Sequence, residues 1–272
     1  MTNEEGWTTR RRGEMPFLDH LEELRWRILW SLLSVGIGAV VGFILVYYFD
    51  VMGLLLHPLR VAYDDPQYKL INLSPADPFF ITLKLGIVVG VLLVFPIIVY
   101  QIWSFLSPAL EKHEKRAIIP ALYLGLVLFL CGVSLAYFVA LPLTLDFFQN
   151  FQVDYLEEQL EVGKTLAFIT KLLLGFGFIF ELPVVVMILS VMGLVTPEFL
   201  SSKRRHAIVL ITVLASFLTP GDVITLTIML MVPLFFLYEF SIFLSRVIWK
   251  RKKARERDDF PSEPPEGAVE AG

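Results

Sequence analysis

Carboxylates stand beside arginines in residues 19–27, just ahead of the first long apolar run. The segment contains Asp19, Glu22 and Glu23 together with Arg25 and Arg27. Cytoplasmic ends of membrane spans usually carry lysine and arginine, so carboxylates packed there need an explanation. A cationic partner that binds them is the simplest one. The alternative is that Glu23 pairs with Arg27, one helical turn further along the same helix.

The residues around this cluster have helical spacing. One apolar stripe would be formed by Phe17, Leu18, Leu21, Leu24 and Ile28. The acidic residues at positions 19 and 23 and the arginine at position 27 fall on another face of the same helix. The pattern predicts an amphipathic interfacial helix that runs into the first span.

Two further groups of residues could do chemistry. Residues 107–116 form a short loop of mixed charge in which Glu111 and Glu114 could share a helical face, although a solvated loop is the alternative. Glu181 lies near the middle of an apolar run, where insertion scales give a cost of about 2.5–3.5 kcal/mol. Such a carboxylate normally faces a bundle interior or a water-filled cavity. The alternative is a structural glutamate that is hydrogen-bonded to a neighbouring helix.

The elements that must position these residues are membrane spans. The 272-residue chain is 56% hydrophobic, with a mean hydropathy of +0.67, which indicates a polytopic all-α membrane protein rather than a soluble domain. We expect six spans, at residues 28–49, 78–106, 117–148, 166–192, 207–219 and 223–248. The fifth and sixth are short: 13 residues of helix extend only about 20 Å, against a hydrocarbon core of about 30 Å.

Positive charge predicts the topology. One side holds arginine and lysine clusters at residues 10–12, 25–27, 112–116, 203–205 and 246–257, whereas the other side has only Arg60, Lys69 and Lys164. Both termini should therefore lie in the cytoplasm. We expect three parts: a cytoplasmic N-terminus at residues 1–27, a six-helix domain at 28–248 and a disordered cytoplasmic tail at 249–272. No cleavable signal peptide is expected, because a charged stretch follows the first arginines.

Nothing in the sequence supports an enzyme, and we expect none. The four histidines are scattered without ligand spacing, the single Cys131 lies in an apolar run, and no hydrolase, zinc-protease or phosphate-loop motif occurs. We expect no cofactor and no metal. A small-solute or ion transporter that uses Glu181 and Lys84 as a coupling pair is the alternative function, although no internal repeat supports it.

Several motifs, in order, resemble the TatC family, the polytopic subunit of the twin-arginine protein translocase. The resemblance covers about residues 16–246. The matching segments are Phe17–Arg27, Ser74–Phe79 with Lys84, Ser107–Arg116, Phe180–Pro183, Leu194–Leu200 with Lys203–Arg205, and Leu218–Asp222.

The resemblance implies a receptor for twin-arginine signal peptides that exports folded proteins across the bacterial plasma membrane. Glu23 and Glu114 would receive the two guanidinium groups, with Asp19 and Glu111 beside them. Arginine presents a planar fork that a carboxylate accepts bidentately, and lysine does not replace it well. Glu181 resembles the family's intramembrane glutamate. The short fifth and sixth helices would dock single-span subunits of the TatA and TatB type, through Thr219 and Thr225, within an oligomeric complex in membrane lipid.

Overall fold

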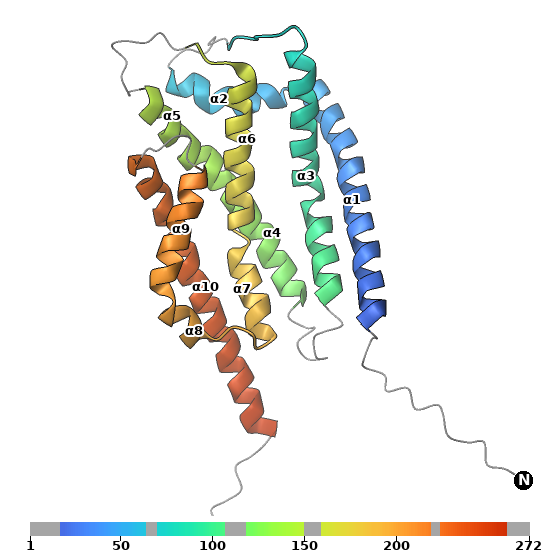
Figure 1. Cartoon of the computed structure of the whole chain (residues 1–272), viewed down its shortest axis with the longest axis vertical. Helices are drawn as coiled ribbons and strands as arrows, with labels where there is room; N and C mark the ends of the chain where they lie inside the picture. Colours follow the sequence, from blue (N-terminus) through green and yellow to red (C-terminus); the bar gives the residue numbers. More distant parts are fainter. Residues whose placement is uncertain (1–16, 64–69, 107–117, 150–158, 219–223, 260–272) are drawn as a thin grey trace, which may run out of the picture.

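The structure, a computed structural model, describes residues 17–63, 70–106, 118–149, 159–218 and 224–259, and these are almost entirely helical (Figure 1). Five helical segments are long and apolar enough to cross a membrane: 20–48, 77–105, 120–149, 162–191 and 227–254. The prediction of an all-α polytopic membrane protein is confirmed. Helices satisfy their own backbone hydrogen bonds, which lipid cannot do for them.

The first two spans are α1 (Phe17–Tyr48) and α3 (Asp77–Leu106), and they lie side by side (Figure 1). Glycines hold them close. A Cβ built on Gly42 would lie 2.1 Å from the carbonyl oxygen of Gly86, and one on Gly90 would lie 2.5 Å from the Gly38 carbonyl. The two backbones are therefore in direct contact, as in small-residue helix pairs in membranes. Because α1 is one unbroken helix, this contact also fixes the segment that precedes Arg27.

The third span contains α4 (Ile118–Leu135), a π-helical turn η3 (Ala136–Ala140) and α5 (Leu141–Gln149). The fourth is divided into α6 (Val162–Ile179) and α7 (Leu182–Val191). Pro183 within this apolar run predicts a kinked or curved helix, and the structure interrupts the helix at Phe180 and Glu181. Pro183 lies in the first turn of α7, where its missing N–H and its ring are compatible with a helix start but not with a continuing helix.

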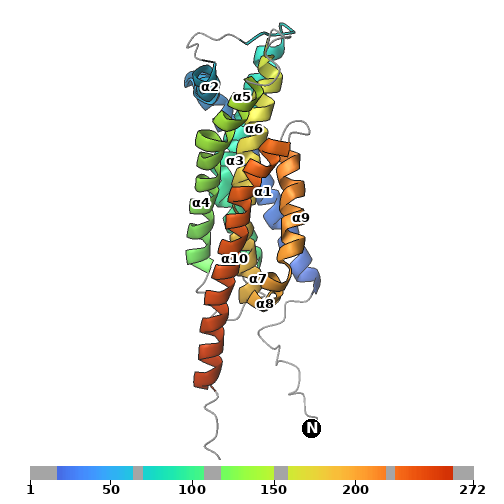
Figure 2. The same cartoon turned by 90° about the vertical axis from the view of Figure 1, so that its left-hand side faces the viewer.

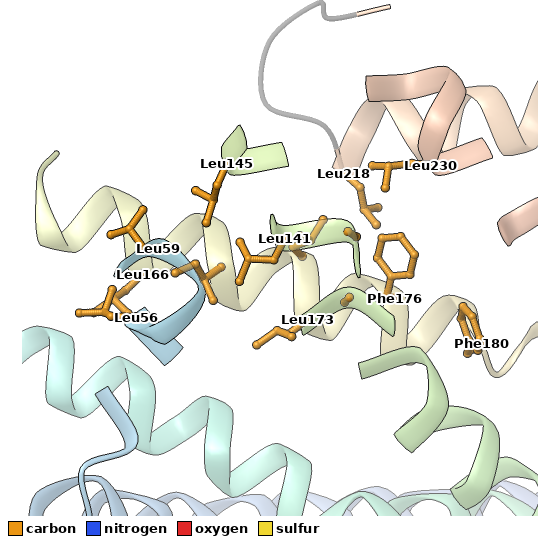
Figure 3. Packing of buried hydrophobic residues seen from close by; sticks show 14 of the residues in the cluster. Leu56, Leu59, Leu141, Leu145, Leu166, Leu173, Phe176, Phe180, Leu218 and Leu230 are labelled. Carbon is orange, nitrogen blue, oxygen red and sulfur yellow. The ribbon is translucent and has the colours of Figure 1, made fainter. Parts of the chain in front are cut away.

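The main core surrounds α6. Ile169, Leu172 and Phe176 of this helix are almost completely buried. Side chains from α2, α5, α9 and α10 converge on it, including Leu59, Leu141, Leu218 and Leu230 (Figure 3). The fourth span is therefore the centre of the bundle, whereas α1 lies at its edge with most of its surface exposed (Figure 1).

The sequence did not predict two short helices, at residues 197–202 and 51–62. Helix α2 (Val51–Ala62) lies across the ends of the spans (Figure 1), and the Asp50 side chain accepts a hydrogen bond from the Gly53 N–H at 2.9 Å. Its 12 residues are too few to cross the bilayer, so a search for spans passes over it. The only sequence signal was the helical spacing of Leu56 and Leu59, three residues apart, and the structure buries both side chains.

The C-terminal part contains α8 (Pro197–Ser202), α9 (Arg204–Leu218) and α10 (Ile224–Asp259). Helix α9 has 15 residues, which confirms the short fifth segment. The prediction of a disordered tail from residue 249 is wrong for 249–259, because α10 continues to Asp259 (Figure 2). Only the apolar stretch of the sixth segment is short, ending before Glu239. Lysine, arginine and glutamate beyond it are strong helix formers.

Candidate binding site

The candidate site is built at the end of the α1–α3 pair, around Glu23. Its Oε1 accepts a hydrogen bond from Nε of Arg27 at 2.9 Å and a second from Nη2 of the same guanidinium. The two side chains are 21% and 22% exposed, so this ion pair is partly removed from solvent. The pairing within α1 that the sequence left open as an alternative is present. The arrangement also demonstrates that a guanidinium fits against this carboxylate.

Helix α3 contributes to the same site from the opposite side. Nη1 of Arg27 donates to Oε1 of Gln101 at 3.5 Å. The His20 ring is stacked on Phe105, with a centroid separation of 4.3 Å, and its Nδ1 lies 3.9 Å from Oε2 of Glu23. Sequence reasoning missed these α3 residues. Their only signal was an amide and an aromatic ring four residues apart at the end of the second span, hence on one helical face.

The second carboxylate oxygen of Glu23 is unsatisfied. Oε2 is buried, and no hydrogen-bond donor from the described residues reaches it. A buried polar atom without a partner costs roughly 1–3 kcal/mol, more when it is charged. The site thus has an acceptor in place for a donor that the chain itself, as far as it is described, does not provide.

The other acidic candidates lie outside the described side chains. Glu111 and Glu114 belong to residues 107–117, between the end of α3 and the start of α4, which the structure does not describe. Asp19 lies within the helical backbone of α1, but its side chain is outside the described part. The structure therefore brings Glu23 together with Arg27 and Gln101, and the roles of the other three carboxylates stay predictions.

Glu181 is at the break between α6 and α7 and faces α4. A Cβ built on Gly125 of α4 would lie 3.0 Å from Oε2 of Glu181, so the carboxylate occupies the space that this glycine leaves. Its Oε1 is buried and receives no hydrogen bond from the described residues, so the bond to a neighbouring helix that the sequence left open as an alternative is not found there. No ion pair joins Glu181 to Lys84, although both residues are described, which removes the geometric basis for a coupling pair.

The two docking residues predicted on the last two helices lie outside the described side chains. Thr219 lies outside the described residues, and the Thr225 side chain does too. The helices themselves are linked by an ion pair between Arg204 of α9 and Glu239 of α10, at 2.9 Å. The charge that interrupts the apolar stretch of α10 thus has a partner.

Comparison with known proteins gives one family. The family model of the Sec-independent protein translocase protein TatC matches residues 19–233. The TatC protein of Aquifex aeolicus is 39% identical over 241 residues, covering 88% of this chain and 98% of that protein. TatC of Escherichia coli K12 is 36% identical over 244 residues, covering 89% and 92%. A crystal structure of the twin-arginine translocase receptor TatC superimposes with a TM-score of 0.73 at 38% identity, covering 85% and 99%.

Proposed function

The chain belongs to the TatC family of Sec-independent protein translocase proteins, and on this basis we propose that it is the translocase subunit that receives twin-arginine signal peptides. The cargo would be folded proteins. The observation that carries the proposal is the Glu23 site, in which one carboxylate already holds a guanidinium and keeps a second oxygen buried, with no hydrogen-bond donor among the described residues.

Glu23 receives one arginine of the signal peptide in this proposal. The incoming guanidinium would donate to Oε2, or it would displace Arg27, for which Gln101 offers another acceptor. Arginine suits the site because its planar fork can donate two parallel hydrogen bonds to one carboxylate, whereas lysine is a point charge. Glu114 would receive the second arginine, with Asp19 and Glu111 adding negative charge nearby.

A titration with two peptides tests this assignment. The full chain in lipid nanodiscs is titrated with a fluorescent signal peptide that bears paired arginines, and with the same peptide bearing paired lysines. We expect Glu23→Gln to raise the Kd for the arginine peptide at least about thirtyfold, because loss of one partner of a buried charge pair costs 2–5 kcal/mol. Glu22→Gln is the matched control, because Glu22 is an exposed residue immediately before Glu23 in the same helix. This substitution should change the Kd less than about threefold.

Equal binding of both peptides, or equal effects of the two substitutions, would refute the site. Glu114→Gln in the same titration tests the second carboxylate, and retention of wild-type affinity would remove it from the site. Size-exclusion profiles and circular dichroism of each variant establish that the bundle is intact.

The membrane setting follows from the charge pattern. We place both termini in the cytoplasm and the chain in the bacterial plasma membrane, because arginine and lysine gather at one end of the spans. Cysteine labelling from either side of sealed vesicles tests the orientation: a cysteine added at residue 272 should react only from the cytoplasmic side. Reaction from the outer side alone would reverse the topology.

Single-span TatA- and TatB-type subunits would dock on α9 and α10 within an oligomeric complex. The support is the length of α9 and its exposed apolar stripe of Val209, Val213 and Phe217, each about two-thirds exposed and four residues from the next. Thr219 and Thr225 would donate hydrogen bonds there. Cysteines at 213 and 217 should form crosslinks with such subunits, and crosslinks only from the α1 face would contradict this docking site.

A further inference from the structure

A basic hollow lies between α8 and α10. Helix α8 is at the same end of the bundle as the start of α1, where the candidate site lies (Figure 1). Its volume is about 470 Å³, and it is open to the surroundings. The lining comes from the first turn of α8, from Ser201 and from one face of α10, where the apolar stretch gives way to basic residues. The signal-peptide proposal does not use this hollow.

Three cations of α10 line the hollow: Arg246, Lys250 and Lys253. Steps of four and three residues place them on one face of the helix. Nη2 of Arg246 donates to Oγ of Ser201 at 3.5 Å, and none of the three forms an ion pair with a described carboxylate. Glu198 is the one acidic residue in the lining, so the hollow keeps a net positive charge.

The hollow is held in shape by hydrogen bonds between α10 and the segment before it. Nε1 of Trp249, which also lines the hollow, donates to the carbonyl of Val195 at 2.9 Å. The Tyr238 hydroxyl donates to the carbonyl of Leu200 at 2.7 Å. These bonds tie both ends of α8 to α10. The three cations therefore lie on a part of α10 that is packed against α8, and not on a helix end without tertiary contacts.

An apolar path leads from the hollow along α10. Phe243 lies three residues before Arg246 on the same face and is 56% exposed, and its ring is stacked with that of Phe240 at 6.4 Å. Along α10, the partly buried ring of Phe240 and the exposed ring of Phe243 thus come before the lining residues of the hollow, which begin at Arg246. This order matches a phospholipid, whose acyl chains lie next to a negatively charged headgroup.

We propose that the α8–α10 hollow binds the headgroup of an anionic phospholipid, with its phosphate among Arg246, Lys250 and Lys253 and its acyl chains along Phe243 and Phe240. Basic pockets between membrane helices bind such headgroups, because each lysine or arginine near the surface adds to the attraction. A zwitterionic phosphatidylcholine headgroup places a choline cation beside these side chains and should bind more weakly.

The test compares two triple variants of the full chain. Arg246→Gln/Lys250→Gln/Lys253→Gln removes the cations of the hollow. Lys203→Gln/Arg205→Gln/Arg251→Gln is the matched control, which removes the same charge from exposed positions outside the lining at the same end of the bundle. Binding of phosphatidylglycerol, phosphatidylcholine and inorganic phosphate to detergent-solubilised protein is measured by native mass spectrometry, with circular dichroism establishing that both variants are folded.

We expect a bound phosphatidylglycerol in the wild type whose Kd rises about tenfold or more in the hollow variant and less than about threefold in the control. Phosphatidylcholine should bind more weakly than phosphatidylglycerol to the wild type. Equal losses in the two variants would overturn the site, because they would indicate diffuse attraction to surface charge. Equal binding of both lipids, or inorganic phosphate that competes as well as the lipid, would overturn the assignment to an anionic phospholipid. Normal peptide binding by the hollow variant separates this result from the signal-peptide proposal.

Discussion

Replacing Gly42 with alanine perturbs the contact that holds α1 against α3. The added methyl carbon would lie 2.1 Å from the Gly86 carbonyl oxygen and 2.6 Å from the Gly90 nitrogen. Ordinary contacts begin at 3.4 Å, so the shortfall is about 1.3 Å. Both atoms belong to a helix backbone and cannot move aside as a flexible side chain would. The two helices must separate, and overpacking of this kind costs about 1–3 kcal/mol.

Gly36→Ala is the matched control, because it lies on the same helix and its added Cβ meets nothing within 4 Å. The assay is unfolding in mixed micelles of dodecyl maltoside and increasing sodium dodecyl sulfate, followed by circular dichroism. We expect Gly42→Ala to lower the free energy of unfolding by about 1–3 kcal/mol and Gly36→Ala to leave it unchanged or raise it by a few tenths.

The separation of the helices should also reach the candidate site. Arg27 and Gln101 lie on opposite members of the pair, with their side-chain atoms already 3.5 Å apart. Gly42→Ala should therefore weaken this bond and lower the affinity for a paired-arginine peptide several-fold. Equal stabilities of the two alanine variants would refute the inference that glycine contacts set the distance between these helices.

Three further changes have expected outcomes. Arg27→Gln removes the guanidinium that occupies Glu23, so the paired-arginine peptide should bind several-fold more tightly in the nanodisc titration; weaker binding would show that Arg27 is needed to hold the site. Ser245→Ala leaves the buried Ser190 hydroxyl without its 2.8 Å partner and should cost about 1–3 kcal/mol in micelle unfolding, whereas the double alanine variant should recover part of that loss. Trp249→Phe removes the hydrogen bond to the carbonyl ahead of α8 and should lower stability by about 1 kcal/mol, with no loss if the indole bond is irrelevant.

Parts of the fold could be predicted because they depend on local composition. Long apolar runs must become helices in a bilayer, and their number and approximate ends follow from the sequence. Length or charge alone was a poor guide to two other parts. Helix α2 is too short to be recognised as a span, and residues 249–259, where disorder was predicted, contain charged helix formers that extend α10. The break at Glu181 was marked only by Pro183.

Some contacts of the candidate site could be predicted from the sequence, and others could not. Glu23 and Arg27 are four residues apart on one helix, so their pairing was visible in the sequence as one of two alternatives. Gln101 was not visible, because it is 74 residues from Arg27 and reaches it only through the packing of α1 on α3. The glycines that permit this packing are spaced four apart in both helices, at 38 and 42 and at 86 and 90. That spacing is a known signal for close helix pairs, but it does not say which helices meet.

The sequence by itself determined an all-helical membrane protein, its spans, and an acidic cluster beside arginines at one end of them. These properties follow from side-chain hydrophobicity and from spacing along one helix. Only the tertiary structure decided which helix α1 packs against, that Glu23 keeps one oxygen buried without a described donor, and that Glu181 fills the space beside Gly125. Such contacts join residues far apart in the chain. Their geometry depends on the distance between helix backbones to a precision of about an ångström, which no local sequence pattern specifies.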